Sequence, residues 1–275
     1  MSLTAAVLFG LVEGFTEFLP ISSTGHLLVL ADVLNLGQTA NTEEAIKSYE
    51  IAIQLGAILA VLGLYRHRFL TMIEGIAGKS ESGRRVLVGV LIAFVPAAIV
   101  GLVGENAIKE HLFGVWPVVC AWAVGGVLVI VFSRRGVLTP RDGTTLEGIT
   151  ARNALLIGLA QVVALWPGTS RSLVTIAAAL VVGLSMRAAV EFSFLLGFVT
   201  LSAATGYEIL KNGHVMIDAF GWFTPLVGLV AAFLAAVISI RWMVGYLEKH
   251  DLEIFGWYRI AIAALVTVVA STGVI

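Results

Sequence analysis

Long apolar runs alternate with short polar segments along this chain. A helix needs roughly 20 consecutive apolar residues to cross the hydrocarbon core of a bilayer. Six runs are long enough or nearly so, and each is expected to form a transmembrane helix: residues 50–66, 86–104, 115–133, 191–210, 222–240 and 257–275. The pattern of hydrophobic positions therefore predicts an all-α integral membrane protein.

Two further apolar regions, residues 3–36 and 153–184, are broken in the middle. The breaks contain Glu13, Glu17, Pro20 and the run 22–26 in the first region, and Gln161, Pro167 and the run 168–172 in the second. A helical arm of about ten residues rises about 15 Å, which is half of the hydrocarbon thickness. Irregular backbone at that depth survives only where protein or a wet cavity surrounds it. We therefore expect two re-entrant helical hairpins, which place residues 22–26 (the first tip) and 168–172 (the second tip) near mid-membrane.

The two broken regions resemble each other in sequence. Gly-Leu-Val-Glu at 10–13 recurs as Gly-Leu-Ala-Gln at 158–161, and Phe-Leu-Pro at 18–20 is echoed by Leu-Trp-Pro at 165–167. Each broken hairpin is also followed by three predicted spans. We interpret residues 1–275 as a single membrane domain of two repeats, about 1–133 and 151–275, inserted with inverted topology. Matched broken segments in inverted halves predict a binding site between them.

Basic residues in the predicted loops indicate the orientation. They concentrate in loops 66–85 and 134–152: Arg66, Arg68, Lys79, Arg84, Arg85, Arg134, Arg135, Arg141 and Arg152. By the positive-inside rule both loops are cytoplasmic. Loops 37–49 and 105–114 and both termini then face outward. The first hairpin is thus expected to enter from outside and the second from the cytoplasm.

Composition agrees with a chain for which the bilayer is part of the solvent. Hydrophobic residues make up 59% of the chain and charged residues 13%, about half the charge of a soluble domain. The net charge of −1 and the lack of a basic tail argue against a nucleic-acid partner. The N-terminus has no basic segment or cleavage site typical of a signal peptide, so residues from 3 onward are expected in the mature structure. The single cysteine, Cys120, is expected to face lipid or to pack.

The first hairpin brings two carboxylates to bilayer depth. Glu13 and Glu17 are four residues apart and share one face of the ingoing arm. Carboxylates at this depth are costly and indicate function, and two of them repel unless they share a proton, a cation or a basic partner. We expect one of these partners, such as a metal ion, beside the pair. The alternative is a structural pair that bonds to backbone in the turn.

The first tip is rich in hydroxyl groups. Ser22, Ser23, Thr24 and Gly25 suit a helix N-cap, and the free N–H groups of a helix start attract phosphate. Ser23 and His26 are three residues apart, so they can face the same side. A histidine beside a hydroxyl can activate a nucleophile or protonate a leaving group. The alternative is that the hydroxyls only cap the helix and that His26 bonds to a carbonyl.

The second tip adds a positive charge to a similar set of hydroxyls, Thr169, Ser170 and Ser172. Arg171 needs an anion at membrane depth, and its planar guanidinium suits phosphate oxygens. Its alternative role is a salt bridge to Glu13 or Glu17. The two roles can coexist, because an empty site still needs its charges balanced.

Other polar residues are interpreted as structural. Gln54 and Gln161 are expected to form helix–helix hydrogen bonds. Glu50 and Glu191 lie at predicted span ends, where solvation or capping is the expectation. Arg259 follows Trp257 and Tyr258 in a pattern typical of an interfacial anchor. The remaining histidines are placed in loops and lack metal-ligand spacing: His67, His111, His214 and His250.

Together the two tips predict a site for an oxyanion. Two helix N-termini from opposite leaflets would bring a serine, a histidine, two carboxylates and an arginine to a charge that grows during reaction. A lipid that carries phosphate or pyrophosphate is the natural substrate. A transporter or flippase of a lipid phosphate remains an alternative, because inverted repeats with broken helices are a transporter architecture. A phosphatidic-acid-type phosphatase is disfavoured, since no histidine follows Arg171 before His214.

Residues 13–26, Glu-Gly-Phe-Thr-Glu-Phe-Leu-Pro-Ile-Ser-Ser-Thr-Gly-His, closely resemble the first signature of the undecaprenyl-pyrophosphate phosphatases, the bacitracin-resistance family. Residues 167–172, Pro-Gly-Thr-Ser-Arg-Ser, resemble the second signature. The resemblance extends over nearly the whole chain. One departure is Leu173, where the family usually has glycine, and it puts the local backbone of the second tip in question.

The resemblance implies hydrolysis of undecaprenyl pyrophosphate to undecaprenyl phosphate and inorganic phosphate, which recycles the lipid carrier for peptidoglycan synthesis. It also implies a divalent cation, Mg²⁺ or Ca²⁺, and an active site that faces the outer side of the bacterial plasma (inner) membrane. Glu17, Ser23, His26 and Arg171 would be catalytic, with Glu13 in support. The nucleophile, Ser23 or water, and the assembly state, monomer or homodimer, stay open.

Overall fold

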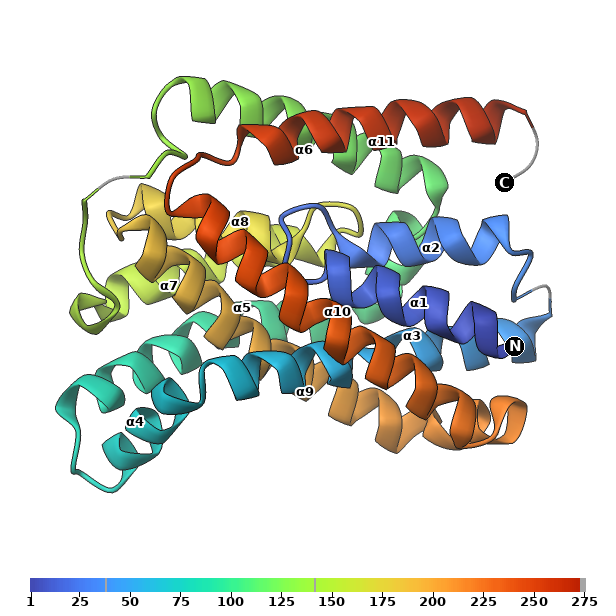
Figure 1. Cartoon of the computed structure of the whole chain (residues 1–275), viewed down its shortest axis with the longest axis horizontal. Helices are drawn as coiled ribbons and strands as arrows, with labels where there is room; N and C mark the ends of the chain where they lie inside the picture. Colours follow the sequence, from blue (N-terminus) through green and yellow to red (C-terminus); the bar gives the residue numbers. More distant parts are fainter. Residues whose placement is uncertain (38, 141, 273–275) are drawn as a thin grey trace.

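The computed structural model describes residues 1–37, 39–140 and 142–272. Its α-helices are α1 (Leu3–Thr16), α2 (Ser23–Val33), α3 (Ala40–Leu64), α4 (Arg66–Ile76), α5 (Glu81–Leu112), α6 (Val115–Arg134), α7 (Ala151–Gln161), α8 (Arg171–Val181), α9 (Met186–Phe220), α10 (Phe223–Leu247) and α11 (Glu253–Ser271). Two short 3₁₀ helices are η1 (Leu146–Gly148) and η2 (Val162–Leu165). The described residues form no named strand, which confirms the all-α class (Figure 1).

Six helices, α3, α5, α6, α9, α10 and α11, are long and apolar enough to cross a membrane. Each overlaps one predicted span, so the number and order of the spans are confirmed. Many large apolar side chains on these helices are exposed, as lipid-facing residues must be. Cys120 is likewise exposed on α6. The chain is a multi-pass membrane protein.

The predicted span boundaries were too narrow. The helix expected at 50–66 begins at Ala40, because the side chain of Thr39 caps its first turn in a capping box with Thr42. The helix expected at 191–210 runs from Met186 to Phe220, starting at an N-cap serine, Ser185, and ending before a glycine with φ +67°. Apolar runs mark only the lipid-facing length of a helix, which continues in polar residues beyond it.

Two predicted loops are also largely helical. Loop 66–85 contains α4, and most of loop 105–114 belongs to the last turns of α5. Arg141, which was counted in the loop charge, lies outside the described residues, as do the last three positions of the predicted span 257–275.

Each broken region forms a pair of short helices instead of one long helix. α1 and α2 make the first helix pair, and α7 and α8 make the second. The longest of these helices has 14 residues, which is about 21 Å of helix and shorter than the hydrocarbon core. In Figure 1 the turn between α1 and α2 meets the turn before α8 in the middle of the molecule.

Close packing fixes the first helix pair. α1 packs against α10 (Figure 1), and a Cβ on Gly14 would stand 2.2 Å from the carbonyl oxygen of Ala232. Only glycine permits this approach, as small residues do where membrane helices touch. α3 packs against α9 and α10, and α6 packs against α11.

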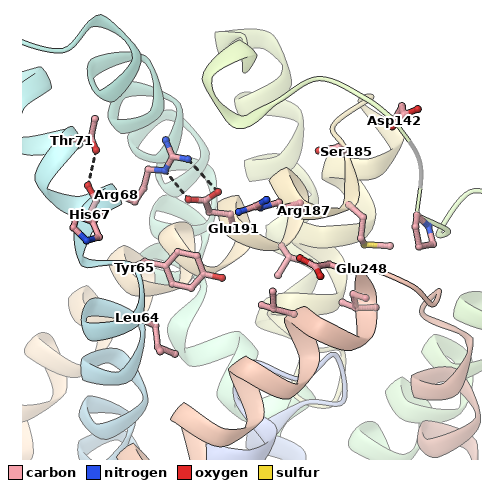
Figure 2. A pocket seen from close by; sticks show the side chains of 15 residues that line it. Leu64, Tyr65, His67, Arg68, Thr71, Asp142, Ser185, Arg187, Glu191 and Glu248 are labelled. Carbon is pink, nitrogen blue, oxygen red and sulfur yellow. Dashed lines mark hydrogen bonds and ion pairs between the residues drawn. The ribbon is translucent and has the colours of Figure 1, made fainter.

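A cavity of about 760 Å³ lies beside the junction of α3 and α4. Figure 2 shows its charged wall, in which Arg68 reaches Glu191 at 2.7 Å. Arg68 also donates to Glu147 at 2.6 Å. Glu191 was expected to be solvated or to cap a helix, and it forms an ion pair with Arg68 instead.

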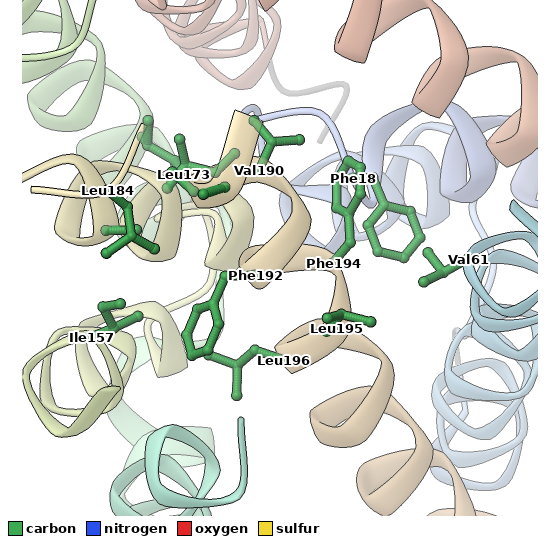
Figure 3. Packing of buried hydrophobic residues seen from close by; sticks show 14 of the residues in the cluster. Phe18, Val61, Ile157, Leu173, Leu184, Val190, Phe192, Phe194, Leu195 and Leu196 are labelled. Atoms are coloured by element: carbon green, nitrogen blue, oxygen red, sulfur yellow. The ribbon is translucent and has the colours of Figure 1, made fainter. Parts of the chain in front are cut away.

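The main apolar core lies around the start of α9, includes residues of the second helix pair, and reaches Phe18 in the turn between α1 and α2 (Figure 3). Phe18 packs edge-on against Phe194 with ring centroids 5.1 Å apart, and Phe194 contacts Tyr65 at 5.7 Å. Leu173 is 6% exposed and belongs to this core. The leucine at the position where the resemblance implies glycine therefore packs into the core, and its backbone N–H donates to the hydroxyl of Ser170 at 3.3 Å.

Candidate active site

The two tips adopt the same unusual backbone conformation. Ser22 has φ 73° and ψ 98°, and Ser170 has φ 74° and ψ 110°. Each serine stands immediately before a helix. The left-handed region costs a non-glycine residue roughly 1–2 kcal/mol, and such residues cluster at functional sites. Ser22 and Ser170 therefore have matching backbone conformations at the starts of α2 and α8.

Hydrogen bonds join the two tips directly. Gly168 donates its backbone N–H to the hydroxyl of Ser22 at 3.1 Å. Ser172 donates its hydroxyl to the carbonyl oxygen of Leu19 at 3.0 Å. The hydroxyl of Ser22 therefore links the tips and does not cap α2, which has no side-chain cap. The expectation that Ser22 acts only as a cap is wrong.

Glu17 bonds both to Ser23, the candidate nucleophile, and to the guanidinium of Arg171. Ser23 donates its hydroxyl to Oε2 of Glu17, and Nη2 of Arg171 donates to Oε1 at 3.0 Å. All three side chains are largely buried. Arg171 also donates to the carbonyl oxygen of Ser193 at 3.1 Å and lies over the ring of Phe18. The predicted salt bridge to Glu17 is confirmed, and it crosses from one helix pair to the other.

Glu13 lies one turn before Glu17 and is fully buried, at 0% exposure. Neither of its carboxylate oxygens has a hydrogen-bond partner among the described residues. The alternative in which Glu13 bonds to backbone in the turn is therefore wrong. A buried carboxylate without partners requires a proton or a cation.

His26 bonds to groups other than Ser23. Its Nδ1 lies 2.6 Å from the carbonyl oxygen of Ser22, so this nitrogen carries the proton and donates it. Its Nε2 then accepts from the hydroxyl of Tyr258 at 2.8 Å. The hydroxyl of Ser23 is bonded to Glu17 instead. The sequence placed histidine and serine on one side, but the turn of α2 directs them to different partners.

Arg259 is not an interfacial anchor. It is fully buried, and its Nη2 donates to the carbonyl oxygens of Gly168 and Ala121, both at 2.8 Å. A Cβ on Gly125 would stand 2.3 Å from this nitrogen, so glycine on α6 makes room for the guanidinium. Consecutive residues of α11 thus hold both tips, Tyr258 the first and Arg259 the second.

The sequence contained a signal for this role. The buried residues of α11 form one stripe along the helix: Phe255, Gly256, Arg259, Ala263 and Val266. Arg259 lies within that stripe, on the face that packs against α6. A charged residue on the buried stripe of a membrane helix indicates function more than anchoring.

A cavity of about 170 Å³ lies between the tips. Its wall includes six of the predicted site residues: Glu17, Ser22, Ser23, Thr24, Ser170 and Arg171. Gln54, Gln161 and Thr200 also line it, and sequence reasoning assigned none of them to the site. Gln161 was expected to bond between helices, but both atoms of its amide lack a partner among the described residues. That expectation is wrong.

Other predicted residues lie outside this cavity wall. Gly25 packs against Trp122, because a Cβ there would stand 2.7 Å from the indole. Ser172 bonds to Leu19, as described above. Thr169 is half-buried in the second tip. Their roles in substrate binding stay predictions.

The larger cavity of Figure 2 has none of the predicted catalytic residues in its wall. Its wall contains the ion pair of Arg68 with Glu191, whereas the wall of the smaller cavity joins a hydroxyl, a carboxylate and a guanidinium. We therefore place the candidate active site at the smaller cavity. Such a trio can activate an oxygen nucleophile and stabilise a growing negative charge.

Two further expectations for polar residues were wrong. Glu50 lies well inside α3 and not at its end. Three of the four histidines assigned to loops, His67, His111 and His214, lie in helices. Within the described part of the chain, no group of three or more His, Cys, Asp or Glu residues could hold a metal ion by itself.

Comparisons with known proteins agree with the geometry. The family described as "Bacitracin resistance protein BacA" matches residues 6–265. The chain is 46% identical over 263 residues to the undecaprenyl-diphosphatase of Sorangium cellulosum, covering 95% of this chain and 84% of that protein. It is 44% identical to the undecaprenyl-diphosphatase of Methylibium petroleiphilum (98% and 96% covered) and 43% identical to that of Nitrosomonas europaea (99% and 96% covered).

Proposed function

The chain belongs to the bacitracin resistance protein BacA family, and we propose that it hydrolyses undecaprenyl pyrophosphate to undecaprenyl phosphate and inorganic phosphate. One observation carries the proposal: Ser23 and Arg171, from different helix pairs, both bond to Glu17 beside one cavity. The reaction would return the lipid carrier to peptidoglycan synthesis. The substrate is a lipid, so it can reach the cavity from the bilayer.

In the membrane, the two helix pairs act as re-entrant hairpins of two inverted repeats. The lengths of α1, α2, α7 and α8, which are too short to cross, support this arrangement. The matching conformations of Ser22 and Ser170 support the repeats. The basic residues of loops 66–85 and 134–152 support a cytoplasmic position for both loops, with the site open to the outer side of the bacterial plasma membrane. Labelling of single cysteines placed in loops 37–49 and 66–85 of a Cys120→Ser background tests this orientation.

The proposed first step is attack by Ser23 on the terminal phosphorus. The bond from Oγ to phosphorus forms while the bond from phosphorus to the bridging oxygen breaks, and the hydroxyl proton passes to Glu17. Arg171 and the N–H groups of residues 23–26 stabilise the phosphoryl oxygens. Phosphoryl transfer depends mainly on such positioning and charge stabilisation. The hydrogen bond from Ser23 to Glu17 supports Glu17 as the base.

The bridging oxygen departs with undecaprenyl phosphate and carries negative charge. His26, together with Tyr258, passes a proton to this oxygen. In the second step, water attacks the phosphoserine and gives up one proton, which restores the His26–Tyr258 pair. The bond from Oγ to phosphorus breaks, Oγ of Ser23 recovers its proton from Glu17, and inorganic phosphate leaves. A rival mechanism is direct attack by water that Glu17 activates. Rapid quenching with radiolabelled substrate distinguishes them, because only the first mechanism leaves a labelled phosphoserine at Ser23.

A divalent cation, Mg²⁺ or Ca²⁺, fits the residues present. Glu13 has two buried carboxylate oxygens without partners, whereas both oxygens of Glu17 are already engaged. Mg²⁺ is usually bound by one or two carboxylates together with substrate phosphates and water. Glu13, assisted by Glu17, would hold the ion, which would offset the negative charge of the pyrophosphate when bound.

A direct test is phosphate release from a long-chain polyprenyl pyrophosphate by the detergent-purified protein, with and without chelator. Wild type should release phosphate, and Arg171→Ala should lose at least about 10³-fold in rate. The matched control is Arg134→Ala, which removes an arginine paired with Glu253 at 2.9 Å on the surface. Equal rates for Arg171→Ala and wild type would contradict the proposal.

The homodimer stays a prediction. The elution volume of the same preparation in size-exclusion chromatography tests it.

One observation favours a second candidate function, translocation of a lipid phosphate. The cavity of about 760 Å³ contains Tyr65 in its wall, and ring contacts lead from Tyr65 through Phe194 to Phe18 beneath Arg171. Aromatic contacts thus connect the wall of the larger cavity with Arg171 in the wall of the smaller one, and two cavities linked in this way suit alternating access. Hydrolysis proceeds in detergent, whereas translocation requires a sealed vesicle. A sample that moves lipid phosphate in vesicles but releases no phosphate in detergent would favour translocation.

A further inference from the structure

We infer that Gln161 is a substrate-binding residue whose side-chain amide contacts the pyrophosphate together with its cation. This inference rests on the proposed function, because it assigns a ligand to the same cavity. Gln161 is the last residue of α7 and belongs to the second helix pair. Neither tip includes it.

The first support is an unsatisfied amide in a buried place. The side chain is 2% exposed, and neither its oxygen nor its nitrogen has a hydrogen-bond partner among the described residues. Buried polar groups are nearly always paired, and a buried group without partners is unfavourable for folding. A residue that only stabilised α7 would not leave both halves of its amide unpaired.

The second support is the position of this amide. Gln161 lines the cavity of about 170 Å³ whose wall also contains Glu17, Ser23 and Arg171. One turn earlier, Gly158 packs so closely on α5 that a Cβ there would stand 2.4 Å from the carbonyl oxygen of Ala93. This contact holds α7 against α5. The backbone of Gln161 is thus held beside the cavity.

The chemistry of the amide identifies its ligand. Nε2 donates and Oε1 accepts, so a ligand that satisfies both must offer an acceptor and a donor side by side. A pyrophosphate oxygen accepts from Nε2, and water bound to a divalent cation donates to Oε1. The pyrophosphate with its hydrated cation offers both groups, whereas a bare anion satisfies only half of the amide.

A comparison with the first helix pair explains why this residue is neutral. Gln161 occupies the place in Gly158-Leu159-Ala160-Gln161 that Glu13 occupies in Gly10-Leu11-Val12-Glu13. Both side chains are buried and unpartnered. A second carboxylate here would add a negative charge to the wall of a site that already contains Glu17 and must accept a pyrophosphate. The amide of Gln161 has an acceptor, Oε1, as a carboxylate would. It adds a donor, Nε2, and it does not repel the pyrophosphate.

The test compares Gln161→Met, which replaces the amide with an apolar side chain of similar size, and Asn153→Leu on the same helix. Asn153 donates to the carbonyl oxygen of Val182 at 3.3 Å, away from the cavity. The measurements are kcat and KM for phosphate release, and Tm in detergent with and without Mg²⁺ plus farnesyl pyrophosphate.

Gln161→Met should keep or raise Tm without ligand, because an unpaired buried amide is removed. It should lose the rise in Tm caused by Mg²⁺ with farnesyl pyrophosphate, and its kcat/KM should fall by about 10- to 100-fold, mainly through KM. Asn153→Leu should show the reverse, with a lower Tm and an unchanged kcat/KM. A purely structural role predicts a lower Tm for both variants.

The inference would be overturned if Gln161→Met had the kcat/KM of wild type and the same rise in Tm with Mg²⁺ and farnesyl pyrophosphate. It would also be overturned if this ligand mixture did not raise the Tm of the wild-type protein. A wild-type protein that is stabilised through Gln161 but releases no phosphate would leave the inference standing and refute the proposed hydrolysis. Gln161→Glu provides a further check, because it keeps an acceptor and loses the donor. Wild-type kcat/KM in Gln161→Glu would contradict a contact between Nε2 and phosphate.

Discussion

The first and second tips have the same backbone and use it differently. Ser22 and Ser170 share one left-handed conformation at the start of α2 and α8. The hydroxyl of Ser170 accepts from Leu173 and caps its own helix, whereas the hydroxyl of Ser22 accepts from Gly168 of the other tip. One helix start is therefore satisfied by its own cap, and the other is not.

This difference divides the chemistry between the two halves. The first-turn N–H groups of α2 have no side-chain cap, so they are free to bind an anion. The capped helix α8 contributes the guanidinium of Arg171 instead. Two segments with the same backbone conformation can thus have different functions, depending on which N–H group the serine hydroxyl accepts from. The N–H groups of a helix start are then either bonded within the protein or available to a ligand.

The largest expected effect comes from removing the hydroxyl of Ser23, which is in the first tip and donates to the carboxylate of Glu17. Ser23→Ala should reduce kcat by about 10⁴-fold, since removal of a nucleophile leaves only positioning and charge stabilisation. Ser133→Ala is the control, because Ser133 is also a buried serine but lies on α6. Phosphate release measures both. Near-normal turnover by Ser23→Ala would eliminate Ser23 as the nucleophile and leave attack by water.

The next effect tests the unpaired carboxylate of the first helix pair. Glu13→Gln should weaken the apparent affinity for Mg²⁺ by about 10- to 100-fold, the usual range for groups that support a metal site. The control is Glu208→Gln, because Glu208 is a buried carboxylate that already accepts hydrogen bonds from Ser48 and Asn212. Titration of phosphate release with Mg²⁺ gives both values. An unchanged Mg²⁺ dependence in Glu13→Gln would remove Glu13 from the cation site.

A matched pair of serine variants tests the comparison itself. Ser22→Ala leaves the buried N–H of Gly168 without its acceptor, so it should lower kcat/KM by about tenfold and the free energy of unfolding by about 1–3 kcal/mol. Ser170→Ala removes a helix cap and should lower the free energy of unfolding by about 1 kcal/mol, with a smaller effect on kcat/KM than Ser22→Ala. Both positions have positive φ, so the backbone strain of alanine is the same in each. Equal effects on activity and stability would show that the two hydroxyls do the same work.

The smallest effect is expected at the support of the first tip. Tyr258→Phe removes the hydrogen bond to Nε2 of His26 and keeps the stacked ring. One net hydrogen bond corresponds to a loss of about 2- to 10-fold in kcat. Tyr246→Phe is the control, because Tyr246 stacks on His250 away from the site. A loss in Tyr258→Phe as large as that in Ser23→Ala would give Tyr258 a direct chemical role.

The sequence was sufficient for the features that depend on local pattern. Six apolar runs predicted six long helices, and the breaks near Pro20 and Pro167 predicted the short helix pairs. Oppositely charged groups at bilayer depth predicted the pair of Glu17 with Arg171, because neither charge is tolerated alone. The ends of α3 and α9 were missed, because polar turns beyond the lipid carry no apolar signal.

Contacts between distant elements could not be predicted in the same way. Arg259 follows two aromatic residues, so its sequence neighbours suggested an interface, while its position on the buried stripe of α11 directs it to Gly168. Spacing placed His26 beside Ser23, but the partners of a side chain depend on which groups other helices bring, here Tyr258. Gln161 was misassigned for the same reason, since sequence does not show that a buried amide lacks a partner.

The central claim is that Ser23 of α2 and Arg171 of α8 act on one phosphoryl group. A double-mutant cycle measures this directly, using kcat/KM for radiolabelled undecaprenyl pyrophosphate in wild type, Ser23→Ala, Arg171→Ala and the double variant. Residues that act as a unit are strongly non-additive. We predict that Arg171→Ala costs less than about tenfold once Ser23 is alanine. A further loss of about 10³-fold on that background, the full effect of the single variant, would mean that the two tips act independently and would contradict the account.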